Sequence, residues 1–210
     1  VLDVLEEAYG ELGEFFDHYP VEEGRERFAV VLYERDDFDR VTGLGDWAGG
    51  AFDGTIRVPV ADFHREKRRL KIVLRHELVH AFVAEVAPNE REVPGWLNEG
   101  LAQYLEPEFL NERDQSARRA SKRLAQSGGE LFALSDLRNT LSGWSDKTKI
   151  ARAYDQSLAF TGFVQRYYGE RVLVKMLRAA GEEGSDVASG FRKATGVELE
   201  AVAGDFSRSL

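Results

Sequence analysis

The sequence contains no cysteine, which excludes disulfide bonds, thiol catalysis and cysteine-ligated metals. Positive charge is also scarce, since 28 Lys and Arg residues stand against 37 Asp and Glu residues, for a formal net charge of -9. This balance argues against nucleic-acid and anionic-membrane partners, because both favour clustered Lys and Arg. Any metal site must therefore use histidine and carboxylate ligands.

The chain also lacks an apolar run close to the roughly 20 residues that a membrane-spanning helix needs. Its most apolar stretch, residues 71–87, is interrupted by charged residues, so we expect no transmembrane segment. The sequence begins with Val1 instead of methionine, which indicates a processed form or a fragment, with further domains possible outside it. These features favour an extracytoplasmic location but leave the compartment open.

Strand patterns come first along the chain and helical patterns follow, which predicts an α+β fold. Phe28–Tyr33 is dense in β-forming residues and predicts a buried strand. Trp47–Val60 predicts a hairpin around the Asp53-Gly54 turn, and Pro59 makes its second half an expected edge strand. Helical periodicity covers residues 1–15, 62–87, 94–106, 112–127, 151–168, 171–180 and 197–207.

Two of the four histidines lie four residues apart in the segment LRHELVHAFV, residues 74–83. Four residues make nearly one helical turn, so His76 and His80 project from the same side and could share one metal. Glu77 lies about 100° around the helix, near enough to take a proton from a water at that metal. The alternative is a pair of core histidines with satisfied hydrogen bonds, and a third ligand would distinguish the two.

A catalytic zinc takes three protein ligands and leaves one position for water. No histidine follows His80, so the third ligand must be a carboxylate if it comes from farther along the chain. Glu99 lies in the segment PGWLNEGLAQYLE, with eighteen residues between it and His80. This segment predicts a second helix, which the loop 88–94 allows to pack beside the first. The spacing therefore favours one Zn²⁺ per chain, held by His76, His80 and Glu99.

The pattern HELVH at 76–80, followed after eighteen residues by Glu99 in WLNEG, resembles the gluzincin zinc peptidases, which include thermolysin and aminopeptidase N. The Asn-Glu-Gly form is most similar to aminopeptidase N and the bacterial peptidase MA-like domains. The resemblance implies a single thermolysin-like zincin domain over residues 1–210. Its β-sheet lobe (1–87) would carry the HExxH helix, and its helical lobe (88–210) would carry the glutamate ligand.

The resemblance also implies an activity. Glu77 would act as general base while water attacks a peptide bond in a peptide or protein substrate. Whether the enzyme would be an endopeptidase or an aminopeptidase stays open. The alternative function is a catalytically weak or inactive zincin-fold module that holds peptides without cutting them.

Further roles follow from the resemblance. Gluzincins pair substrate with an edge strand, and the 47–60 hairpin is similarly placed. Within GAFDG at 50–54, the residues Gly50, Ala51 and Asp53 loosely match the aminopeptidase N motif whose glutamate holds the substrate amino terminus. A simple turn role is the alternative for Asp53. Aminopeptidase N stabilises the oxyanion with a tyrosine, and Tyr154, at the start of a predicted helix, is the corresponding candidate.

Two other features have simpler interpretations. A basic cluster precedes the histidines and is typical of a solvated helix face. Its members are Arg65, Lys67, Arg68, Arg69, Lys71 and Arg75. Gln103 follows Glu99 by one helical turn and could orient a metal ligand.

Overall fold

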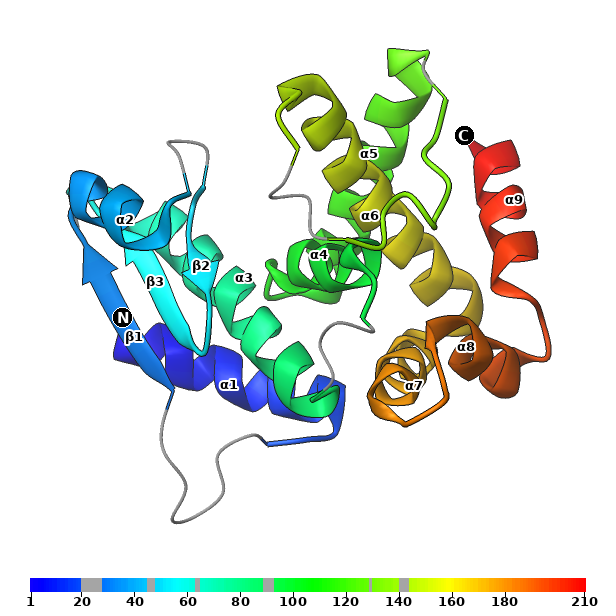
Figure 1. The fold of residues 1–210 in the computed structure, drawn as a ribbon, viewed down its shortest axis with the longest axis horizontal. Coiled ribbons are helices and arrows are strands. Elements are labelled where there is room, and N and C mark those ends of the chain that lie inside the picture. The colour runs from blue at the N-terminus through cyan, green and yellow to red at the C-terminus, as the bar shows by residue number, and fades with distance from the viewer. Residues whose placement is uncertain (20–27, 45–47, 63–64, 89–92, 129, 140–143) are drawn as a thin grey trace. The chain divides into compact units, whose positions relative to one another are not determined.

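The computed structural model describes residues 1–19, 28–44, 48–62, 65–88, 93–128, 130–139 and 144–210. These residues form a mostly helical α+β fold with a small sheet, so the predicted fold class is confirmed (Figure 1). They divide into two compact units, Val1–Glu85 and Val86–Leu210, which are described separately below. No helix in the described ranges is long and apolar enough to cross a membrane.

The sheet belongs to the first unit. Its strands are β1 (Ala29–Tyr33), β2 (Ala51–Phe52) and β3 (Thr55–Pro59), in the order β1-β3-β2. β1 runs parallel to β3, and β2 pairs antiparallel to it with Phe52 opposite Ile56. The predicted hairpin turn is confirmed, because Gly54 has a φ of 90°, which favours glycine. Trp47, the expected start of the hairpin, lies outside the described residues.

The prediction that residues 55–60 form an edge strand is wrong, because β3 is the central strand. Pro59 is tolerated there because of the side that its nitrogen faces. The N–H of Val60 donates to the carbonyl of Tyr33 at 2.8 Å, and successive strand residues face opposite neighbours. Pro59 therefore faces β2, whose pairing with β3 extends only as far as Arg57. No ladder bond is lost at the proline.

Three helices complete the described part of the first unit: α1 (Leu2–Phe16), α2 (Arg35–Thr42) and α3 (Lys67–Val86). α1 and α3 pack through aromatic rings, with the Phe16 and Phe82 centroids 5.4 Å apart and nearly parallel. The expectation that the 28–33 strand is buried is wrong. β1 lies at the sheet edge, where Val31 and Leu32 are 36% and 40% exposed. α2 was not predicted, because it buries only Phe38 among charged residues.

The second unit is helical in its described part. It contains α4 (Gly95–Leu105), α5 (Leu110–Ser127), α6 (Lys147–Tyr168), α7 (Glu170–Gly181), α8 (Val187–Thr195) and α9 (Leu199–Ser209). Both α4 and α5 pack against α6 (Figure 1). The Asp146 side chain caps α6 by accepting from the Thr148 N–H at 2.9 Å. Gly169, with a φ of 84°, separates α6 from α7.

Candidate active site

The two motif histidines lie on one side of α3 in the first unit. Their ring centroids are 4.8 Å apart and the rings are nearly perpendicular, at 80°. Both imidazoles are half-buried, whereas Glu77 is only 5% exposed. The burial follows from the sequence, because apolar residues surround this part of the helix. Leu74, Leu78, Val79, Phe82 and Val83 are all buried. As predicted, the second half of the helix is buried, so its polar side chains are held in fixed surroundings.

An ion pair that sequence reasoning missed fixes the turn next to His76. Arg75 was expected on a solvated face, yet it is 2% exposed and its guanidinium pairs with the carboxylate of Glu11 on α1. One turn earlier, Lys71 lies 3.8 Å from Glu7 on the same helix α1. Apolar neighbours on α3 were the only sequence signal that Arg75 might be covered. These contacts tie α3 to α1 and restrict its rotation.

The hairpin reaches the catalytic candidate Glu77 at Gly50. A Cβ atom built at Gly50 would lie 2.6 Å from Glu77 Oε1 and 2.9 Å from both Glu77 Cγ and Val73 Cγ1. Only a residue without a side chain fits here, so the backbone ahead of β2 contacts the glutamate directly. Sequence reasoning matched Gly50 to a motif but did not predict this contact.

The pairing of β2 determines which backbone groups it leaves available. The N–H of Asp53 donates to the Thr55 carbonyl at 3.3 Å, so the odd-numbered residues of this segment face β3. Phe52 and Gly50 then face the outer side, away from β3. Ala51, which faces β3 and pairs with Arg57, is half-buried. The outer groups of this segment are thus adjacent to Glu77.

Asp53 is engaged within the hairpin. Its carboxylate accepts from the Thr55 N–H at 3.3 Å and from Arg57 Nε at 3.1 Å. The hydrogen bond with Asp53 raises the pKa of the Arg57 guanidinium, which also donates to the Tyr33 hydroxyl at 2.6 Å. This geometry is that of a turn residue that also anchors β3, and any substrate amino group would compete with Arg57 for the carboxylate.

Glu99 lies in the second unit on α4 and is half-buried. Pro94 directly precedes this helix as its N-cap, as the Pro94-Gly95 signal predicted. The next residue, Gly100, contacts α6 closely: a Cβ there would lie 2.2 Å from Thr161 Oγ1 and 2.7 Å from the Ser157 carbonyl oxygen. The glycine after the glutamate therefore brings α4 against α6. The connection to α3 includes residues 89–92, which lie outside the described residues.

Tyr154 is half-buried on α6, in the same unit as Glu99. Its carbonyl oxygen accepts from the Gln103 side chain at 3.1 Å. The following residue, Asp155, binds the guanidinium of Arg123 on α5 through both carboxylate oxygens. This hydrogen bonding raises the pKa of Arg123. The Tyr154 turn is therefore held from two sides, by α4 and by α5.

The structure thus assembles the candidate residues in two groups. His76, Glu77, His80 and Gly50 come together in the first unit, and Glu99 and Tyr154 lie on packed helices of the second. Among the described side chains able to hold a metal ion are both histidines and Glu99. Two neutral imidazoles and one carboxylate are a typical ligand set for catalytic zinc, so the donor chemistry fits that ion.

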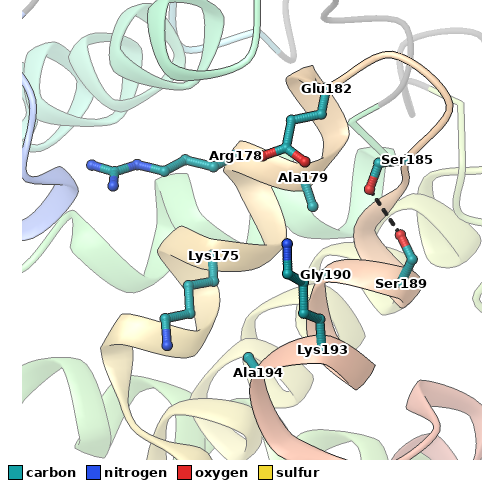
Figure 2. A pocket seen from close by; sticks show the side chains of 9 residues that line it. All are labelled: Lys175, Arg178, Ala179, Glu182, Ser185, Ser189, Gly190, Lys193 and Ala194. Atoms are coloured by element: carbon teal, nitrogen blue, oxygen red, sulfur yellow. Dashed lines mark hydrogen bonds between the residues drawn. The ribbon is translucent and has the colours of Figure 1, made fainter.

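A separate cavity of about 400 Å³ lies between α7 and α8 of the second unit (Figure 2). Three basic residues line it: Lys175, Arg178 and Lys193. Their side chains are exposed and extend in different directions, and the hydroxyls of Ser185 and Ser189 beside them bond to each other at 3.0 Å. None of the predicted site residues lines this cavity, so it has no part in the candidate active site.

Comparison with known proteins identifies one family. Residues 42–210 match the Peptidase MA superfamily, which leaves α1, β1 and most of α2 outside the matched span. No curated protein and no solved structure matches the chain.

Proposed function

Because the chain belongs to the Peptidase MA superfamily, which suggests a protease acting on peptides or proteins, we propose that it is a zinc-dependent peptidase of the gluzincin type. The observation that carries the proposal lies within the first unit. Glu77, between the two histidines of α3, touches Gly50 at the outer edge of the hairpin. A general base next to a strand edge is the arrangement that hydrolysis of an extended peptide requires.

The proposed ligands are His76, His80 and Glu99, which would hold one Zn²⁺ per chain. When bound, this ion would lower the pKa of a water molecule to about 7 and polarise the scissile carbonyl. The 4.8 Å separation of the imidazole centroids supports the first two ligands. The third rests on the interval of eighteen residues between His80 and Glu99 and on their placement in a thermolysin-like domain.

Glu77 performs the proton transfers. Its carboxylate takes the proton of the attacking water and passes it to the leaving amine. Burial to 5% exposure and the contact with Gly50 keep the carboxylate in one place, which favours transfer over a short, fixed distance. The Tyr154 hydroxyl donates a hydrogen bond to the oxyanion that forms on the substrate.

The substrate is an extended peptide that adds to β2 as a further strand. Its backbone pairs with the outward-facing groups of Gly50 and Phe52, so the peptide passes directly beside Glu77. Ala51 and Asp53 complete the segment: Ala51 is paired to β3, and Asp53 fixes the turn through Arg57. The engagement of Asp53 with Arg57 favours internal cleavage over capture of a free amino terminus.

The experiment combines zinc analysis with cleavage of a defined peptide library. We expect about one zinc per wild-type chain, and Glu77→Gln should retain zinc yet lose nearly all hydrolysis, because this side chain handles protons and not the metal. Glu85→Gln, an exposed position on the same helix, is the matched control and should keep wild-type turnover. Zinc-loaded wild type that cuts no peptide would support a peptide-binding module instead, and unchanged turnover in Glu77→Gln would refute the mechanism.

A further inference from the structure

Gln103 connects the two helices that carry the second unit's site residues. It lies on α4, one turn after Glu99, and its side-chain nitrogen Nε2 has two partners. It donates to the Glu99 carbonyl oxygen at 3.3 Å and to the Tyr154 carbonyl oxygen at 3.1 Å. Both partners are carbonyl oxygens, which only accept, so the amide must present its NH₂ group to them. The two protons of this group serve the two carbonyls.

These bonds are additional to the helical ladder. In an α-helix the carbonyl of residue i accepts from the N–H of residue i+4, and each carbonyl oxygen has a second lone pair. The Gln103 amide can use that second lone pair on both helices without breaking either ladder. It therefore acts as a cross-link between the turn that carries Glu99 and the turn that carries Tyr154.

Close packing makes this cross-link specific in length. Gly100 brings α4 against Ser157 and Thr161 of α6, leaving no room for even a Cβ atom. Across that contact the Gln103 side chain spans the gap with both hydrogen bonds within 3.3 Å. A shorter side chain would not reach both carbonyls, and one without a donor would leave both with one partner fewer.

We infer that Gln103 is a positioning residue that sets the separation between the carboxylate of Glu99 and the hydroxyl of Tyr154. The inference rests on the proposed function, in which the first group binds zinc and the second stabilises the oxyanion. Gln103 touches neither substrate nor metal. It acts by fixing the two turns from which those side chains project.

Three single variants test the inference. Gln103→Leu removes the donor, and Gln103→Glu keeps the shape but turns a carboxylate toward two carbonyl oxygens. Tyr104→Phe is the matched control, because it is the next residue on α4 and loses one 3.1 Å hydrogen bond, to Asp114 on α5. The measurements are kcat and KM on a cleaved peptide at saturating zinc, zinc affinity by chelator competition, and the urea midpoint of unfolding.

Gln103→Leu should lower kcat and zinc affinity, each by about 10- to 100-fold, with KM little changed. Gln103→Glu should lose at least as much. Tyr104→Phe should shift the urea midpoint comparably while kcat and zinc affinity stay within about 2-fold of wild type. In a Tyr154→Phe background, Gln103→Leu should reduce kcat by less than about 3-fold, because the group that it positions is already gone.

The inference is overturned if Gln103→Leu matches Tyr104→Phe in both kcat and zinc affinity, or if its effect on kcat is as large in the Tyr154→Phe background as in wild type. Failure of the proposed function looks different. A wild type that binds zinc but cuts no peptide refutes catalysis, and the inference then stands or falls on zinc affinity alone. A wild type that binds no zinc overturns both.

Discussion

Gly50→Ala tests whether the hairpin positions the general base. The added Cβ would lie 2.6 Å from Glu77 Oε1, about 0.8 Å closer than the 3.4 Å at which ordinary contact begins. The carboxylate is the movable end of a side chain, so it would shift by most of that distance. A misplacement of about 1 Å in a reacting group can cost about 10²-fold in rate. We therefore expect kcat to fall by about 10- to 100-fold.

The stability cost should be small by comparison, at about 1–3 kcal/mol, because the clash is relieved by a side chain and not by the backbone. Gly49→Ala is the matched control, since its Cβ would meet only Val73 Cγ2, at an ordinary 3.5 Å. Peptide-cleavage kinetics, zinc content and urea unfolding are measured for both variants. Zinc should stay at wild-type content in each. If the two variants have equal kcat, the carboxylate of Glu77 is not held in its reactive position by the hairpin.

Two further predictions concern α4. Glu99→Gln should reduce the zinc content well below one per chain, measured by metal analysis after dialysis, because a neutral amide is a poor zinc ligand; full retention would remove Glu99 from the ligand set. Gly100→Ala should destabilise the chain by about 1–3 kcal/mol or more in urea unfolding, since its Cβ would lie 2.7 Å from the backbone oxygen of Ser157. The control Gly204→Ala, which meets only the flexible end of Arg208 at 3.4 Å, should be neutral or stabilising, and an equal loss in both would contradict the packing argument.

Local signals predicted many of the element boundaries correctly. Pro94 precedes α4, and the Asp53-Gly54 pair forms the hairpin turn with Gly54 at a φ of 90°. The expected helix at residues 1–15 corresponds to α1 at Leu2–Phe16, and the one at 112–127 to α5 at Leu110–Ser127. These features succeed because proline, glycine and a long apolar period act within a few residues of the chain.

Features that depend on distant partners were predicted poorly. The edge assignment for residues 55–60 failed because the position of a strand depends on β1, which lies more than 20 residues earlier. α8 was missed because it is short, although Asp186 and Ser189 form a capping box at its start. The bond from the Ser189 N–H to the Asp186 carboxylate lowers the pKa of that group, consistent with a well-formed cap.

The candidate site shows the same division between local and distant information. The spacing of His76 and His80 indicates a shared helix face, and α3 has that face with the rings 4.8 Å apart. The contact of Gly50 with Glu77 and the bridge from Gln103 to Tyr154 join residues that are far apart in sequence. Neither glycine nor glutamine carries a pattern that names such a partner. These contacts became visible only when the elements were placed in space.

The support for α3 has a consequence for the limits of this domain. Matching to the family begins at residue 42, yet the helix that bears both histidines is held by α1, at residues 2–16. Arg75, directly before His76, is covered to 2% exposure and needs the Glu11 carboxylate, since a buried guanidinium without a partner is strongly destabilising. Phe82 likewise rests on Phe16 and Tyr9. The matched span alone would expose both side chains, so the unit that positions the candidate site extends at least to α1.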